Sequence, residues 1–305
     1  MSATSSASPA EPLGPMIVSA HTPTQPIRVV VVGAGGTGGR LIPPLMQVLR
    51  NHDTVAIVDG DHVEDRNLAR QNFRPRDVGE NKAEVMVRRY RREGIQTDAY
   101  ATMLEKANIA EITRGRGTPA RVVILGCVDN WKARQEMQGA LAGIESLWID
   151  GGNERRGGQV ILSTYHWPMK VTGPHPAKYG ELHTTSANWH IRGMSAMPQL
   201  LASQPWHCDR CNVDNKPEAA VCKTCKQPEA SCRDRIDLQT VAVNQLSATC
   251  ILNILSCVLY QVPMTACGAF FSTLNTMSPI RLKTVRWDQR EILPETTYAD
   301  TGKPK

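Results

Sequence analysis

The chain has 305 residues, enough for one large domain with an addition, and its 35 basic and 29 acidic residues give a net charge of +6. This mild, dispersed excess does not require nucleic acid, and we expect no nucleic-acid partner. We also expect no membrane partner, because the most apolar stretch, residues 248–262, is interrupted by Asn253, Ser256 and Gln261 and suits a buried helix.

The N-terminal segment and the cysteines are both informative about the cellular compartment of the protein. Residues 1–26 are rich in Ser, Pro, Ala and Thr and lack the basic start and continuous apolar core of a signal peptide, so we predict a disordered leader. Nine cysteines occur, five of them between positions 208 and 232. This clustering favours zinc in a reducing compartment over a disulfide framework, and we predict a cytoplasmic protein.

The first strong element is a buried β-branched strand, residues 27–32, followed by a glycine-rich turn and an apolar stretch at 41–49. Such a turn cradles phosphate, because backbone N–H groups and the positive helix end face the anion. The alternative is a plain strand-to-helix turn, and the motif alone leaves the nucleotide open. Pro43 and Pro44 predict that the helix starts late or is kinked. The glycines expected at the nucleotide are Gly33, Gly35, Gly36 and Gly38.

A second predicted strand, residues 55–58, ends in Asp59, which is placed to bind ribose hydroxyls; Asp61 follows as a further nucleotide-binding candidate. Residues 59–73 read DGDHVEDRNLARQNF, and Lys82 comes next at the start of a helical pattern. A triphosphate requires such cations, because charge on the α-phosphate and the leaving pyrophosphate must be balanced, whereas a nicotinamide does not. A solvated polar loop is the alternative. The phosphate candidates are Asn67, Arg70, Gln71 and Lys82.

A third predicted strand, residues 122–125, leads into GCVDNWKAR and places Asp129 at the carboxyl edge of the sheet, where open α/β sheets bind ligands. A carboxylate there can hold Mg²⁺, which keeps several waters and bridges to phosphate oxygens. The alternative role for Asp129 is to cap the helix that begins near Trp131.

These motifs together resemble the ThiF/MoeB family, relatives of the ubiquitin-activating enzymes. The resemblance rests on GAGGTGG, D-x-D-x-V-x-x-x-N-L-x-R-Q, Lys82 and C-x-D-N-x-x-x-R, runs from about residue 27 to 159, and resumes near 231. The late segments SCRDRIDLQTVAVNQLSAT, GAFFSTLN and SPIRL are most similar to ThiF-type activators of bacterial ubiquitin-like operons. No segment before residue 27 resembles the family's arginine-bearing first helix, so the sequence does not decide whether the protein forms a homodimer.

The resemblance implies an enzyme that uses ATP to adenylate the C-terminal glycine of a ubiquitin-like protein. It implies that Asp59 binds ribose, that Asn67, Arg70 and Lys82 bind phosphates, and that Asp129 binds magnesium. A sulfur-carrier-protein adenylyltransferase of the ThiF/MoeB type is the nearest alternative. Two others are a nicotinamide-dependent oxidoreductase and a non-catalytic RNA- or ubiquitin-binding module built around zinc.

The zinc motif lies in residues 206–225, WHCDRCNVDNKPEAAVCKTC. Two C-x₂-C pairs put four thiolates on two tight turns, as a closed tetrahedral zinc site requires, and free or redox thiols are the alternative. The pattern resembles a zinc finger of the Ran-binding-protein class, which includes binders of ubiquitin and of single-stranded RNA. The predicted ligands are Cys208, Cys211, Cys222 and Cys225.

Cys232 lies outside both pairs, and we predict that it accepts the activated carboxyl as a thioester. Arg233 and Arg235 supply the positive surroundings that help a thiol to ionise. The position just ahead of VAVNQLSAT resembles that of the reactive cysteine in family members, and implies transfer to a conjugating enzyme or another cysteine acceptor. A spare zinc ligand and a plain exposed thiol are the alternatives.

The predicted fold is α/β: a doubly wound, Rossmann-like adenylation domain with a mostly parallel sheet and a small zinc-binding insert. The nucleotide-binding core spans residues 27–165, a crossover loop 166–205, the zinc insert 206–228, and the rest of the adenylation domain 229–305. Within this last part we expect a helix over about 235–260, packed on the sheet, and closing strands over 269–281.

Overall fold

The computed structural model describes most of the predicted core and shorter pieces of the rest of the chain. The described residues are 16–17, 26–115, 121–141, 143–153, 157–165, 170–171, 189–191, 206–208, 213–215, 223–226, 241–264, 266–275, 278–286 and 292–294. The predicted leader, the crossover loop and the segment with Cys232 lie largely or entirely outside these residues.

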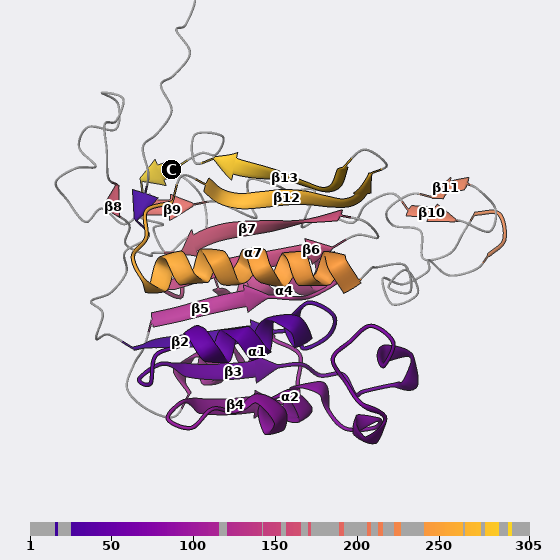
Figure 1. Cartoon of the computed structure of the whole chain (residues 1–305), viewed down its shortest axis with the longest axis horizontal. Helices are drawn as coiled ribbons and strands as arrows, with labels where there is room; N and C mark the ends of the chain where they lie inside the picture. The colour runs from indigo at the N-terminus through magenta and orange to yellow at the C-terminus, as the bar shows by residue number, and fades with distance from the viewer. Residues whose placement is uncertain are drawn as a thin grey trace, which may run out of the picture.

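An eight-stranded sheet forms the centre of the molecule, in the order β13-β12-β7-β6-β5-β2-β3-β4 (Figure 1). Strands β4, β3, β2, β5 and β6 run parallel, and β7, β12 and β13 extend the sheet antiparallel beyond β6. The strands are β2 (Ile27–Val32), β3 (Thr54–Val58), β4 (Gln96–Tyr100), β5 (Arg121–Gly126), β6 (Ser146–Asn153), β7 (Gly157–Tyr165), β12 (Ala266–Asn275) and β13 (Ser278–Arg286).

The sheet confirms the predicted doubly wound α/β fold. Every residue of β2 is buried, as expected for a strand that is covered on both faces. Because β3 and β4 lie on one side of β2 while β5 and β6 lie on the other, the order of strands reverses at β2. Ligands of open α/β sheets bind at the carboxyl ends of the strands at such a reversal.

Helices cover both faces of the sheet. Helices α1 (Gly38–Val48) and α7 (Val241–Leu259) lie side by side in front of it, and α4 (Trp131–Leu141) lies behind (Figure 1). Helix α2 (Lys82–Tyr90) packs against α1, β3 and β4, and α3 (Ile109–Arg114) precedes β5. Two short 3₁₀ turns, η1 (Asp65–Asn67) and η2 (Pro75–Asp77), lie between β3 and α2.

Helix α1 does not start late, after its two prolines. It begins at Gly38 and contains both Pro43 and Pro44. Proline at position 43 cannot donate to the carbonyl of Gly39, four residues earlier. The side chain of Asn72 donates a hydrogen bond to that carbonyl at 3.2 Å, so the polar group freed by Pro43 is satisfied from outside the helix.

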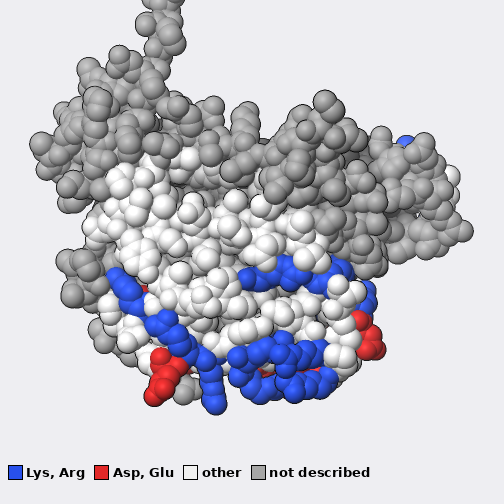
Figure 2. Space-filling model, in the orientation of Figure 1, with Lys and Arg blue, Asp and Glu red and all other residues white. Residues whose placement is uncertain are grey.

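Helix α7 is the predicted late helix, and it packs against α1, β6, β7 and β12. It is long and apolar enough to cross a membrane by length and composition alone, a test that core helices of soluble proteins also pass. One of its faces is buried, including Val243, Ile251, Leu255 and Val258. The helix carries no charged residue, and Figure 2 shows an uncharged surface over it, whereas Lys and Arg gather over α1 and α2.

Three short strand pairs lie outside the eight-stranded sheet in the described part of the chain. In the predicted leader, β1 (Met16–Ile17) pairs with β8 (Lys170–Val171). In the predicted crossover loop, β9 (Trp189–Ile191) pairs with β14 (Ile292–Pro294). In the predicted zinc insert, β10 (Trp206–Cys208) pairs with β11 (Val213–Asn215).

Candidate active site

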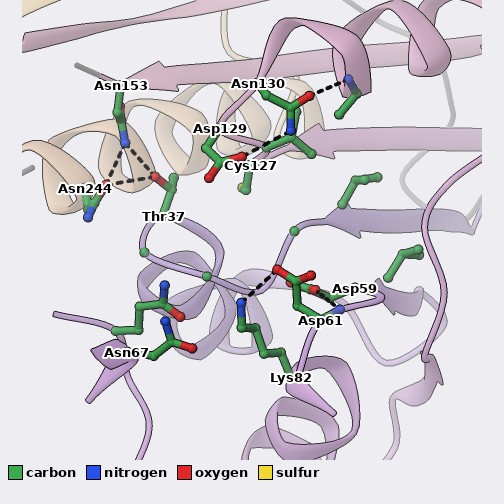
Figure 3. Close-up of a pocket in the computed structure, with 18 of the residues that line it drawn as sticks. Thr37, Asp59, Asp61, Asn67, Lys82, Cys127, Asp129, Asn130, Asn153 and Asn244 are labelled. Atoms are coloured by element: carbon green, nitrogen blue, oxygen red, sulfur yellow. Dashed lines mark hydrogen bonds and ion pairs between the residues drawn. The ribbon is translucent and has the colours of Figure 1, made fainter. Parts of the chain in front are cut away.

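A cavity of about 180 Å³ opens at the carboxyl ends of β2, β3, β5 and β6, where the order of strands reverses (Figure 3). All but one of the predicted nucleotide-binding residues line it; the exception is Gly38. The residues brought together are Gly33, Gly35, Gly36, Asp59, Asp61, Asn67, Arg70, Lys82 and Asp129. Gln71 lines it as well.

Two of the glycines shape the turn after β2. Gly33 has a φ of +94°, a conformation that side chains disfavour, and a Cβ there would lie 2.8 Å from the carbonyl oxygen of Cys127. A Cβ on Gly38 would lie 1.9 Å from the carbonyl oxygen of Gly33. Gly38 is therefore required by the tight start of α1, while Gly35 and Gly36 face the cavity.

Asp59 ties the glycine turn to the loop after β3. Its carboxylate accepts hydrogen bonds from the backbone N–H of Ala34 at 2.7 Å and from that of Asp61 at 2.8 Å. Burial raises the pKa of Asp59 above its usual range, and the positive charge of Lys82 opposes this shift. The carboxylate thus lies at the junction of both loops, at the position predicted from the sequence to bind the ribose.

Lys82 reaches the cavity from the first residue of α2, and its Nζ lies 3.1 Å from the carboxylate of Asp61. The preceding residue, Asn81, was not predicted as part of the site. Its side chain accepts from the N–H groups of Ala83 and Glu84 and donates to the carbonyls of Asp59 and Asp61. Asn81 thus caps α2 and fixes it to the acidic loop; an asparagine just before a helical pattern is the signal that could have found it.

Asn67 and Arg70 come from the segment between β3 and α2. Asn67 is buried, and its side-chain oxygen accepts from the N–H of Glu64 at 3.0 Å. The backbone carbonyl of Arg70 accepts a hydrogen bond from Arg40 of α1 at 3.1 Å. We call Asp59, Asp61, Asn67, Arg70 and Lys82 the charged half of the cavity.

Asp129 follows β5 and is exposed at the opening of the cavity. The neighbouring Asn130, not Asp129, caps α4, because its side-chain oxygen accepts from the N–H of Ala133 at 2.8 Å. The Asn130 amide donates to one oxygen of Asp129 at 3.2 Å. Cys127, nearby, is half-buried, and burial raises the pKa of its thiol.

A buried ion pair supports the loop that carries Asp129. The Arg134 guanidinium bonds to the Asp150 carboxylate at 2.7 Å and to the carbonyls of Val128 and Gly151. Burial raises the pKa of Asp150, and Arg134 opposes the shift. Arg134 is the arginine of the C-x-D-N-x-x-x-R motif, and its contacts join the loop after β5 to the end of β6.

Three uncharged polar side chains that the sequence did not single out form the remaining part of the cavity wall. The Asn153 side chain donates to the Thr37 hydroxyl at 2.6 Å and to the Asn244 side-chain oxygen at 2.8 Å, and that oxygen lies 3.3 Å from the Thr37 hydroxyl. We call Thr37, Asn153 and Asn244 the amide cluster; Figure 3 shows it beside Asp129, apart from Asp61 and Lys82.

The described part of the zinc insert is a hairpin linked to a turn. Asn215 of β11 is buried, and its side-chain oxygen accepts from the N–H of Lys223 at 2.9 Å. This bond links the turn that carries half-buried Cys225 to the end of β11, whose partner strand β10 ends at Cys208. Cys211, Cys222 and Cys232 lie outside the described residues, and among those described no group of three or more His, Cys, Asp or Glu side chains could hold a metal ion.

The doubly wound sheet, the glycine turn and the charged cavity define an α/β protein of the type that commonly binds nucleotides. A model of the ThiF family matches residues 24–292, and the chain belongs to the ThiF family. The predicted family resemblance is therefore confirmed at this level.

Two curated relatives are similar to parts of the chain. The NEDD8-activating enzyme E1 catalytic subunit of Arabidopsis thaliana is 32% identical over 120 residues, which cover 38% of this chain and 25% of that protein. The sulfur carrier protein ThiS adenylyltransferase of Escherichia coli (strain K12) is 28% identical over 142 residues, or 46% of this chain and 54% of that protein. The chain thus spans about a quarter and about half of their lengths.

Solved structures share the fold. E. coli MccB has a TM-score of 0.52 at 16% identity, with 88% of this chain and 65% of that chain covered. The microcin C7 biosynthetic enzyme MccB in complex with N-formylated MccA has a TM-score of 0.51 at 16% identity, with 85% and 64% covered. At this identity the likeness concerns the fold alone.

Proposed function

We propose that the protein is an ATP-dependent adenylyltransferase that activates the C-terminal carboxyl of a ubiquitin-like protein. The observation that carries the proposal is the convergence of the charged half and Asp129 in one cavity at the strand reversal. The printed names of the relatives, an E1 catalytic subunit and an adenylyltransferase, support it. A nicotinamide-dependent oxidoreductase has no use for this concentration of polar and cationic groups.

In the proposed reaction a carboxylate oxygen of the substrate bonds to the α-phosphorus of ATP. The bond from that phosphorus to the bridging oxygen breaks, and pyrophosphate leaves with the electron pair. Asp59 binds the ribose, and Asn67, Arg70 and Lys82 bind phosphate oxygens and stabilise the charge that develops during transfer. Gly35 and Gly36 let the phosphates approach the backbone.

The residues present fit a magnesium ion. Asp129 has one carboxylate oxygen bonded to the Asn130 amide, and it is not used as a helix cap. Mg²⁺ is commonly held by one or two carboxylates together with substrate phosphates, so no larger protein cluster is required. When bound, Mg²⁺ would neutralise charge on the leaving pyrophosphate. Asp61 is paired with Lys82, which makes Asp129 the metal-binding carboxylate.

The experiment is ATP–pyrophosphate exchange with ubiquitin-fold proteins that end in glycine. Exchange should require the protein substrate and should be lost when its last glycine is removed. A titration with NADH, followed by cofactor absorbance and fluorescence, tests the oxidoreductase. Saturable NADH binding without any exchange would contradict adenylation.

The zinc insert is part of the proposal, as a finger similar to the Ran-binding-protein class. The bond from Lys223 to Asn215 supports it, because it joins the turn that carries Cys225 to the hairpin whose first strand ends at Cys208. We expect one zinc per chain, held by Cys208, Cys211, Cys222 and Cys225, and chelation should unfold the insert while the large domain stays folded. Elemental analysis of fresh protein without zinc would contradict this.

Two outcomes after adenylation, thioester formation and no thioester, can be distinguished by experiment. In a bacterial-type ubiquitin-like pathway, the Cys232 thiolate attacks the carbonyl carbon of the acyl-adenylate, the bond from that carbon to the phosphate oxygen breaks, and AMP leaves. The thioester then passes the acyl group to a conjugating enzyme or another cysteine acceptor. In a sulfur-carrier pathway adenylation suffices, and the similarity to the ThiS adenylyltransferase supports this second candidate. Gels with and without reductant, run after incubation with ATP and the substrate protein, separate them. A reductant-sensitive adduct that persists in Cys232→Ala would show that Cys232 is not the residue that forms the thioester.

A further inference from the structure

We infer that Asn244 donates a hydrogen bond from its side-chain nitrogen to the carbonyl oxygen of the substrate's terminal residue, and so orients the carboxyl toward the α-phosphate. This inference rests on the proposed adenylation and names the residue that recognises the acyl group. It concerns the amide cluster, which none of the roles assigned above uses.

The first argument is the fixed orientation of the Asn244 amide. Its oxygen lies within hydrogen-bond distance of both Asn153 and the Thr37 hydroxyl, so the nitrogen must point the other way. The side chain lines the cavity although the residue is only 3% exposed. Within the described part of the chain no acceptor pairs with this nitrogen, so a buried donor is aimed into the cavity and is available for a ligand.

The second argument is where the nitrogen lies. A Cβ on Gly36 would be 2.6 Å from it, so the amide lies directly over the glycine turn that faces the phosphates. Glycine at position 36 is required by this approach of Asn244. The donor is therefore next to the position of the reacting phosphorus.

The third argument is the order of groups along the sheet edge. Asp59 follows β3, the glycine turn follows β2, Asp129 follows β5 and Asn153 ends β6, and these strands are neighbours in the order β6-β5-β2-β3. A nucleotide whose ribose lies at Asp59 and whose phosphates lie over the glycines leaves the β6 side for the second substrate. The amide cluster is the polar wall on that side (Figure 3).

The chemistry of an amide suits this position. Among the described cavity residues the cations are Arg66, Arg70 and Lys82, and all three come from the chain between β3 and α2 or from α2 itself. A cation on the β6 side would bind the free carboxylate more strongly than the neutral carbonyl of the acyl-adenylate. A neutral N–H donor bonds to both and favours the charged reactant less than a cation would, so it can hold the acyl group through the reaction.

The test uses two stable compounds: sulfamoyladenosine, and N-acetyl-glycylglycyl-sulfamoyladenosine, which mimics an acyl-adenylate with a glycine tail. Calorimetry on the full chain should show that the acyl compound binds the wild-type protein at least about tenfold more tightly. Asn244→Asp keeps the shape and the oxygen that contacts Thr37 and Asn153 but replaces the donor. It should abolish the gain and leave sulfamoyladenosine binding unchanged, as should Asn244→Ala.

The control is Asn253→Asp, which makes the same change on an exposed position of α7 and should keep the full gain. A gain that persists in both Asn244 variants would overturn the inference. So would a parallel loss of sulfamoyladenosine affinity, which would place Asn244 in the nucleotide site, or equal affinity of the wild-type protein for both compounds. A wild-type protein that binds neither compound would instead contradict the adenylation proposal itself.

Discussion

The charged half and the amide cluster line the same cavity but differ in charge and in the way their side chains are held. In the charged half, Lys82 and Asp61 form an ion pair, and Asp59 is bound by backbone N–H groups. In the amide cluster, neutral side-chain hydrogen bonds join residues of three separate elements. Under the proposed function this difference corresponds to two roles: the charged half balances phosphate charge, and the amide cluster orients the acyl group.

The largest expected effect is a loss of stability when the Arg134–Asp150 ion pair, which joins the loop carrying Asp129 to the end of β6, is broken. Arg134→Met leaves the Asp150 carboxylate buried without its partner and should lower the free energy of unfolding by about 3–5 kcal/mol near pH 8. Without Arg134 the pKa of Asp150 rises further, so the folded state binds a proton more readily, and the loss should shrink as the pH falls toward 5.

Urea denaturation at both pH values measures this. Arg121→Met is the control, because its Glu145 partner is partly exposed and such surface pairs contribute at most about 1 kcal/mol. Equal losses for Arg134→Met and Arg121→Met would show that the buried pair does not support the site.

The second-largest effect tests whether the charged half and the amide cluster have different functions. Arg70→Ala and Lys82→Ala should each lower ATP–pyrophosphate exchange by about 10²-fold or more, because they act on charge that develops at the phosphates. In both variants the acyl compound should still bind more tightly than sulfamoyladenosine. Arg91→Ala, an exposed change outside the cavity, is the control. Normal exchange in Arg70→Ala and Lys82→Ala would remove the charged half from the reaction.

The smallest effect is expected at Asn153. Asn153→Ala removes one of the two groups that orient the Asn244 oxygen, so the affinity gained from the acyl group should fall by about fivefold rather than vanish. Calorimetry with the same two compounds measures it, with Asn253→Ala as the control. If Asn153→Ala costs more than Asn244→Ala, Asn153 itself contacts the acyl group and the assignment within the cluster is wrong.

The same contrast explains what the sequence could predict. The charged half comes from one continuous stretch after β3 and from the start of α2, so its motif is visible in the chain. Asn153 is 116 positions from Thr37 and 91 from Asn244, and only the folded sheet and α7 bring them together. Local chemistry also left choices open: the sequence could not tell whether Asp129 caps α4, and the structure gives that role to Asn130.

The fold was predictable for a similar reason. A fully buried β-branched strand followed by glycines indicates a parallel sheet, and β2 and α1 confirm it. The compensation for Pro43 was not predictable, because the Asn72 side chain that satisfies the Gly39 carbonyl comes from a loop 33 residues away.

The most direct test of the adenylation site is exchange by Asp129→Ala, compared with Asp65→Ala, a matched change at an exposed residue that does not line the cavity. With ATP, Mg²⁺ and a ubiquitin-fold protein that ends in glycine, the account predicts that Asp129→Ala loses exchange while its thermal unfolding stays unchanged. Asp65→Ala should exchange like the wild-type protein. Normal exchange in Asp129→Ala would contradict the account.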